Sequence, residues 1–113
     1  MKKYCLTLDL KEDAALIAAY EDHHQKVWPE IIQSITGSGI IQLQIYRLGN
    51  RLVMLLDAKD TFSFEEKAKL DATNNKVQEW ENLMWQYQQA LPLAKPGQKW
   101  VLMTKIFDLQ KSI

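Results

Sequence analysis

Apolar residues recur at every second position in two segments of the chain, 4–10 and 41–46. This alternation is typical of strands with one buried face. Two further segments, 51–58 and 99–109, are apolar on both faces, as in strands of a sheet that is covered on both sides. A Gly-Asn pair separates the second strand from the third, so the pattern predicts that these two form a hairpin.

Helical periodicity and capping residues predict two helices between the first and second strands. Asp13 is a suitable N-cap for the first helix, which we expect over residues 14–25. A proline suits the first turn of the second helix, which we expect over residues 29–36. The glycine-rich stretch at 37–39 then ends that helix.

A second helical region lies between the third strand and the last. Ser63 and Glu66 form a capping box for a helix that ends near residue 70. A longer helix is expected from residue 74 or 75 to residue 90. Its apolar stripe consists of Val77, Trp80, Leu83, Met84 and Tyr87.

The predicted order of elements is β-α-β-β-α-β, which is the ferredoxin-like order. We therefore expect an α+β fold, one domain over residues 1–113, in which helices cover one face of a four-stranded antiparallel sheet. The third and last strands also present apolar side chains to the other face, namely Val53, Leu55, Val101 and Met103. We expect a homodimer, a dimeric α/β barrel that packs sheet against sheet, to bury them. Whether the last strand is exchanged between subunits stays open.

Composition narrows the possible partners. Hydrophobic residues make up 47% and charged residues 25% of the chain, which is typical of a soluble globular protein. The 14 basic residues balance 14 acidic ones without a basic patch, so we expect no nucleic-acid partner. No apolar run is long enough to span a membrane and the first residues do not resemble a signal peptide, so we expect a cytoplasmic protein. A lone cysteine, Cys5, forms no internal disulfide.

The segment from Tyr20 to Glu30 carries the strongest candidate chemistry. Tyr20, His24 and Trp28 are four residues apart and share one face of a continuing helix. A phenol, an imidazole and an indole on one stripe suit a pocket for a small polar ligand, although ordinary core packing has the same spacing. His23 points about 100° away from His24, which predicts that it faces solvent and that the pair binds no metal.

With these residues located, the chain resembles the L-rhamnose mutarotase family over nearly its whole length. The matching positions are Tyr20, His24, Trp28, Pro29 and Glu30, then Gly39, Trp80 and the Lys-Ile-Phe sequence at 105–107. The resemblance implies an isomerase, a small dimer without a cofactor that interconverts the α and β anomers of a 6-deoxy sugar. The chain also lacks a glycine-rich phosphate loop, in agreement with a reaction that needs no nucleotide.

The resemblance also implies roles for individual residues. The family's proton donor falls on His24, its substrate-contacting tyrosine on Tyr20, and a tryptophan of its sugar site on Trp80. An imidazole titrates near neutral pH and therefore suits a reaction that moves a proton from the anomeric hydroxyl to the ring oxygen. Trp28 and Trp80 can stack on the apolar side of the sugar ring, while Tyr20 binds a hydroxyl.

Two positions depart from the family pattern and bear on which sugar is used. The family's rhamnose enzymes have a tyrosine where this chain has Leu43, and a second consecutive tryptophan where it has Glu81. A leucine side chain forms no hydrogen bond, whereas Glu81 can accept one if it faces the pocket, so we expect L-fucose before L-rhamnose. The second proton-transfer group is left open among Glu30, Glu81 and a bound water molecule.

Two other classes of function fit the same fold. One is a different enzyme on this dimeric scaffold, such as a monooxygenase, because the fold carries many activities. The other is a non-catalytic sugar-binding module. The set of Tyr20, His24 and Trp80 favours the mutarotase over the oxygenase, which needs no tryptophan-lined sugar site. A His24→Ala variant that keeps binding and loses turnover distinguishes an enzyme from a binding module.

Overall fold

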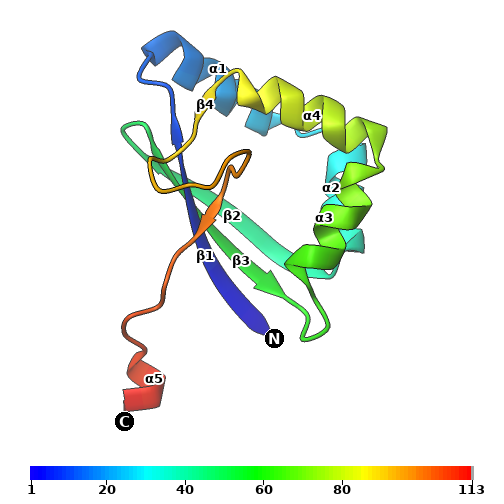
Figure 1. The fold of residues 1–113 in the computed structure, drawn as a ribbon, viewed down its shortest axis with the longest axis vertical. Coiled ribbons are helices and arrows are strands. Elements are labelled where there is room, and N and C mark those ends of the chain that lie inside the picture. Colours follow the sequence, from blue (N-terminus) through cyan, green and yellow to red (C-terminus); the bar gives the residue numbers. More distant parts are fainter. Residues whose placement is uncertain (113) are drawn as a thin grey trace.

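The computed structural model describes residues 1–112 and places the main helices on one side of an antiparallel sheet (Figure 1). Ile113, the last residue of the expected domain, lies outside the described residues. The elements in chain order are β1 (Lys2–Leu10), α1 (Ala14–Gln25), α2 (Pro29–Gly37), β2 (Ile40–Leu48), β3 (Arg51–Ala58), α3 (Phe64–Ala72), α4 (Asn75–Trp85), β4 (Gln88–Gln89), β5 (Val101–Leu102) and α5 (Leu109–Ser112).

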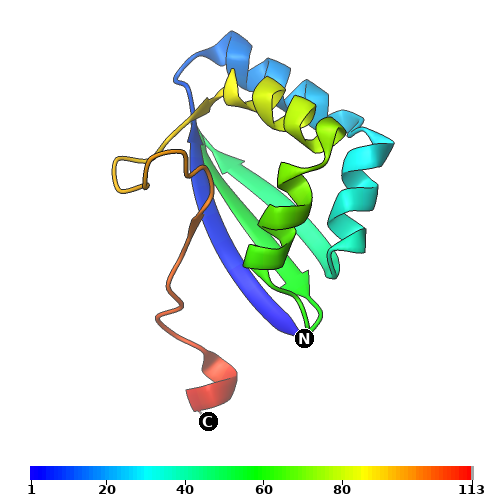
Figure 2. The same ribbon diagram turned by 45° about the vertical axis from the view of Figure 1, so that its right-hand side comes forward.

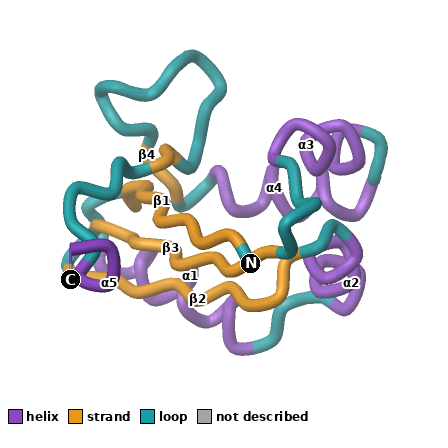
Figure 3. Tube along the Cα trace, turned by 90° about the horizontal axis from the view of Figure 1, so that it is seen from below, coloured by secondary structure: helices purple, strands orange, loops and turns teal. Residues whose placement is uncertain are grey.

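The sheet has the strand order expected of a ferredoxin-like fold. Its order is β2-β3-β1-β4, and β5 also pairs with β1. All these pairs are antiparallel, so β1 is bonded on one edge to β3 and on the other to β4 and β5. Figure 3 shows β1, β3 and β2 side by side, with the loop that joins β4 to β5 beyond β1. The prediction of this fold class is confirmed.

The strand register places alternate residues in the core. Leu6, Leu8 and Leu10 of β1 are buried, and Leu8 pairs with the buried Leu52 of β3. A two-residue turn, Gly49-Asn50, joins β2 to β3, and Gly49 has the positive φ of +59° that glycine adopts without strain. The predicted hairpin is therefore present, with a bulge near Ile40 that shifts the register of β2.

The helices begin where their capping residues predict. The Asp13 side chain accepts a hydrogen bond from the backbone of Leu16, and that of Ser63 accepts one from Glu66. Within residues 1–112, no helix combines the length and the apolar composition that crossing a bilayer requires.

The last long helix is shorter than expected. It ends at Trp85, and Gln88–Gln89 form β4 instead of the helix that the sequence predicts up to residue 90. Glutamines are good helix formers, so local preference favours continuation. The free edge of β1 overrides it, because the backbone carbonyl of Tyr87 accepts a hydrogen bond from Lys11 and Gln88 pairs with Leu10.

The final strand was predicted over 99–109, and only Val101–Leu102 form it. After Met103 the chain leaves the sheet and ends in α5, well away from the other helices (Figure 2). The apolar residues of this segment find no cover among the described residues 1–112, with Ile106 94% and Phe107 69% exposed. Alternation alone therefore overestimates the strand, because a strand also needs an edge and a surface to pack against.

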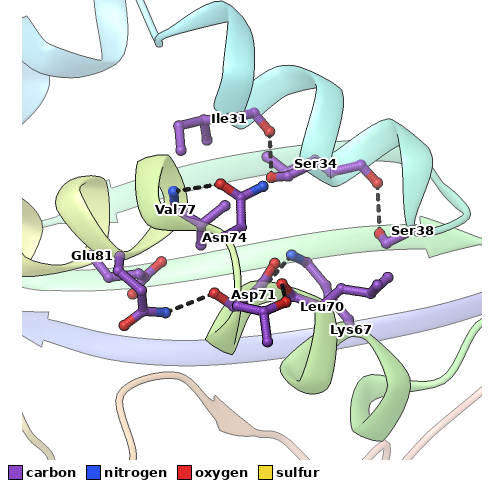
Figure 4. Close-up of polar contacts among 12 residues, drawn as sticks. Ile31, Ser34, Ser38, Lys67, Leu70, Asp71, Asn74, Val77 and Glu81 are labelled. Carbon is purple, nitrogen blue, oxygen red and sulfur yellow. Dashed lines mark hydrogen bonds and ion pairs between the residues drawn. The ribbon is translucent and has the colours of Figure 1, made fainter.

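Capping at the start of α4 leads to a stability prediction. The Asn74 side chain accepts hydrogen bonds from the backbone of Lys76 and of Val77, the second of which Figure 4 shows. Asn74→Ala is expected to lower the free energy of unfolding by about 1 kcal/mol, because two N–H groups lose their acceptor. Urea denaturation measures the change. The control is Asn75→Ala, one residue further along at an exposed position, and an equal loss in that variant contradicts the capping role.

Candidate functional site

A cavity of about 700 Å³ lies between the helices and the sheet. This volume falls in the usual range for small-molecule sites. Most of its wall is apolar, and polar groups from α1, α4 and β4 meet at one part of it. The residues that matter below are Tyr20, His24, Leu43, Trp80, Glu81, Gln88 and Trp100.

Two helices bring the aromatic residues of the site together. Tyr20 and His24 are one turn apart on α1, and their ring centroids are 4.4 Å apart. Trp80 of α4 lies edge-on to His24, with centroids 5.6 Å apart. Tyr20 and Trp80 are buried and His24 is half-buried. The structure thus brings these three predicted site residues to one place in the cavity wall.

The backbone of α1 determines the protonation pattern of His24. Nδ1 lies 2.8 Å from the carbonyl oxygen of Tyr20, and since a carbonyl only accepts, Nδ1 carries the hydrogen. Within residues 1–112 the structure has no hydrogen bond to Nε2, so this nitrogen keeps its lone pair in the neutral ring. Burial lowers the pKa of His24 below 6.5, and the neighbouring His23 lowers it further against the opposing effect of the carbonyl. At neutral pH the ring is therefore a base.

Tyr20 has the opposite shift for the same physical reason. Burial raises the pKa of its phenol to about 12, with a further increase from the charge of Glu81. A hydrogen bond from Gln88 opposes this shift. The phenol stays protonated at neutral pH, so its O–H is a donor available to a bound molecule.

Gln88 is a site residue that the sequence did not single out. It is only 5% exposed, and its Nε2 lies 3.4 Å from the Tyr20 hydroxyl. Its Oε1 is buried and has no hydrogen-bond partner among the described residues. A helix that continued to residue 90, as the sequence predicts, does not indicate a contact between Gln88 and α1. The pairing of β4 with β1 places Gln88 beside Tyr20. Trp100, the residue just before β5, also lines the cavity.

The residues that depart from the family pattern both line the cavity. Leu43 contributes apolar wall from β2, on the side of the sheet that carries the helices. Glu81 lines it from α4 and forms an ion pair of 2.7 Å with Lys99, whose ammonium also bonds the Glu81 carbonyl. Glu30 is half-buried in the first turn of α2, and the described wall of the cavity does not include it.

Of two expectations about aromatic neighbours, the sugar contact of Trp28 stays a prediction and the exposure of His23 needs revision. Trp28 is not part of the described cavity wall; it packs edge-on against Trp80, with centroids 5.1 Å apart. The prediction that His23 faces solvent is wrong, since it is half-buried and its Nε2 lies 3.2 Å from the Tyr87 hydroxyl. The helix face that carries His23 meets α4 and the turn after it, which periodicity within α1 does not reveal.

The far part of the cavity has a different polar character. Lys67 and Asp71 of α3 form an ion pair of 2.7 Å there, one turn apart and mostly shielded (Figure 4). Ser34 of α2 also lines it, with its hydroxyl donating to the carbonyl of Ile31. Among residues 1–112, no three histidine, cysteine or acidic side chains group closely enough to hold a metal ion.

Comparison with protein families gives one match that spans most of the chain. Residues 3–109 match the model of the L-rhamnose mutarotase family. The chain is 44% identical to an L-fucose mutarotase of Xanthomonas campestris pv. campestris, an alignment that covers 100% of this chain and 92% of that protein. It is 33% identical to a UPF0734 protein of Dictyostelium discoideum, over 96% of this chain and 90% of that one.

Solved structures show the same fold in proteins of low sequence identity. An L-rhamnose mutarotase of Formosa agariphila superposes with a TM-score of 0.72 at 18% identity, covering 96% of this chain and 99% of that one. The tetracenomycin F2 cyclase of Streptomyces glaucescens, a type-II polyketide cyclase, gives a TM-score of 0.61 at 14% identity, covering 96% and 98%. At these identities the likeness establishes the fold and not the activity.

The buried position of His24 predicts a pH effect. The pKa of His24 in the folded protein is expected below 6.5. Between that pKa and 6.5, the unfolded chain therefore holds a proton on His24 and the folded chain does not. Stability that depends on neutral His24 is therefore present above 6.5 and is lost as the pH falls towards the folded-state pKa. NMR titration of the ring Hε1 resonance, assigned with a His24→Asn variant, measures the pKa. A midpoint at or above 6.5 contradicts the interpretation.

Proposed function

The chain belongs to the L-rhamnose mutarotase family and is a sugar isomerase of 6-deoxy sugars, and we propose that it interconverts the α and β anomers of L-fucose with His24 as the proton-transfer residue. The observation that carries this proposal is the Tyr20, His24 and Trp80 cluster in the cavity wall. It joins a neutral base, a protonated phenol and an indole in one small volume.

The base begins the reaction. Nε2 of neutral His24 accepts the proton of the anomeric hydroxyl, and the electron pair left on that oxygen forms the carbonyl of the open-chain aldehyde. The bond between the anomeric carbon and the ring oxygen breaks, and the ring oxygen takes up a proton. Rotation about the bond from C1 to C2 presents the other carbonyl face, and the reverse steps close the ring. The imidazolium formed in the first half passes its proton on to the group that protonates the ring oxygen, so His24 is neutral again in the open-chain state and ring closure runs the same transfers in reverse.

The ring oxygen needs a source for its proton. The Glu81 carboxylate is held in an ion pair with Lys99, and Glu30 lies away from the described cavity wall. We therefore assign this step to a water molecule in the cavity that exchanges a proton with His24. Trp80 supplies the flat apolar surface for the C–H face of the sugar.

The choice of sugar rests on the polar groups of the wall. Leu43 offers no hydrogen bond from β2, so a hydroxyl directed at it stays unpaired, at a cost of about 1–3 kcal/mol. L-fucose and L-rhamnose present their C2 and C4 hydroxyls in opposite orientations, so the position of acceptors in the wall selects between them. The relative at 44% identity is an L-fucose mutarotase, which supports the same preference here.

Anomer exchange of the wild-type protein tests this proposal. Two-dimensional exchange NMR is expected to give a larger catalysed rate constant for L-fucose than for L-rhamnose at equal enzyme concentration. His24→Asn is expected to lower the catalysed rate by about 10²–10⁴-fold while the protein stays folded, because an amide cannot take the proton. A preference for L-rhamnose contradicts the sugar assignment. A fully active His24→Asn variant contradicts the assigned role of His24.

We also propose that two copies of the chain pair through the face of the sheet that carries no helices. Val53, Leu55 and Val101 share this face, and Leu55 is 41% exposed at its middle. Tyr46 and Met103 extend the exposed apolar area on the same side. A second copy that packs on this face removes the apolar area from water and gives Ile106 and Phe107 a surface to pack against. The free energy gained scales with the apolar area buried.

Light scattering at micromolar concentration tests the pairing. Wild-type protein is expected at twice the chain mass of 13.2 kDa. Leu55→Glu is expected to shift it towards the monomer, because two buried carboxylates would face each other across the symmetric interface. Leu70→Glu is the matched control, an exposed leucine on α3 away from the sheet, and it is expected to stay dimeric. A wild-type monomer contradicts the proposal.

A further inference from the structure

The Gln88 side chain is the one buried group of the described cavity wall whose hydrogen-bonding capacity is left unused. It is 95% buried, with an exposed fraction of 5%, and its Oε1 has no partner among residues 1–112. Gln88 lines the cavity, and buried carbonyl oxygens are almost always paired, so an unpaired one in this side chain points to a ligand that pairs with it. The reaction described above gives Gln88 no part.

We propose that Gln88 is the specificity-determining residue of the site, and that its carboxamide oxygen accepts a hydrogen bond from the sugar hydroxyl on the carbon next to the anomeric centre. The inference rests on the proposed function and names the part of the substrate that the site reads. It adds a recognition contact from β4 to the site residues of α1 and α4.

The contact between Gln88 and Tyr20 creates a paired donor and acceptor. Gln88 Nε2 donates to the Tyr20 hydroxyl at 3.4 Å, so the phenolic hydrogen is free to point towards the cavity. The Gln88 Oε1 acceptor belongs to the same carboxamide. A sugar hydroxyl both accepts and donates, so it satisfies the Tyr20 O–H and the Gln88 oxygen at the same time.

The fold holds this carboxamide in a fixed place. Gln88 pairs with Leu10 in the register between β4 and β1, and Leu10 is among the most deeply buried residues of the protein. The backbone carbonyl of Tyr87, the residue before Gln88, accepts a hydrogen bond from Lys11. The residue after Gln88, Gln89, pairs with Asp9 and is exposed. Alternation along the strand therefore directs Gln88 into the cavity and Gln89 out of it.

The position of Tyr20 identifies the hydroxyl. Its ring lies 4.4 Å from the His24 ring, whose Nε2 we assign to the anomeric oxygen, and of the two ring atoms bonded to the anomeric carbon only the carbon carries a hydroxyl, so we assign the Tyr20–Gln88 pair to that hydroxyl. This is C2, one of the two carbons at which L-fucose and L-rhamnose differ. A site that reads C2 with a buried acceptor discriminates between the two sugars strongly, because the wrong isomer leaves that acceptor unpaired.

A purely structural role gives a different expectation. The bond of 3.4 Å from Gln88 to Tyr20 is long for an N–H···O contact, and the unpaired oxygen beside it destabilises the empty protein. Leucine has a similar volume and no polar atom to leave unsatisfied. Gln88→Leu is therefore expected to unfold at an equal or higher urea concentration than wild type, and a structural role predicts the reverse.

Substrates that lack a single hydroxyl decide the question. The measurement is kcat/KM for anomer exchange of L-fucose, 2-deoxy-L-fucose and 4-deoxy-L-fucose by the wild-type protein and by Gln88→Leu. In wild type, removal of the C2 hydroxyl is expected to lower kcat/KM by about 10–100-fold, the range for one buried hydrogen bond left unmade. Gln88→Leu is expected to lose a similar factor on L-fucose and to handle the 2-deoxy sugar like wild type.

The controls separate the possible failures. Gln89→Leu, the same change one residue along and on the exposed side of the strand, is expected to retain wild-type values with every sugar. Gln88→Met repeats the test with a flexible side chain should the leucine variant not fold. Equal losses on L-fucose and 2-deoxy-L-fucose in the Gln88 variants, or a wild-type penalty confined to the 4-deoxy sugar, overturn the assignment while the proposed function stands. A wild-type protein that exchanges no 6-deoxy sugar overturns both.

Discussion

Backbone pairing along both edges of β1 is the constraint on which the site depends. On one edge, β3 pairs with it over residues Lys2 to Asp9 and sets the register of the core. On the other, β4 captures the chain just after α4. That capture ends the helix at Trp85 and places Gln88 beside Tyr20. Unpaired N–H and C=O groups on a strand edge are costly when buried, so the edge outweighs the local preference for helix.

Burial sets the chemistry of the site as well as its shape. The same loss of water that stabilises the core lowers the pKa of His24 and raises that of Tyr20. Both shifts favour the uncharged form, because a charge is poorly solvated between α1 and α4. A neutral base and a neutral donor therefore stand side by side at neutral pH. Acid–base chemistry without a net charge in the site suits a neutral sugar.

Two features of the protein reduce its stability as a free chain. One is the unpaired Gln88 oxygen in the cavity wall, and the other is the apolar face of the sheet around Leu55. Unsatisfied polar groups and exposed apolar surface are both unfavourable in water, and both are relieved by binding. Under our proposals a sugar relieves the first and a second copy relieves the second. Binding of either then stabilises the folded state.

The sequence by itself determined most of the fold, through alternation in β1 and β2, the Gly-Asn turn, and the caps Asp13 and Ser63. It also placed Tyr20 and His24 on one stripe, because both lie within one helix, and residues four apart in a helix lie on the same face. The tertiary structure alone decided what meets that stripe. Whether Trp28 or Gln88 reaches the cavity depends on how α2 and β4 dock, and docking follows from long-range pairing and packing that no local pattern records.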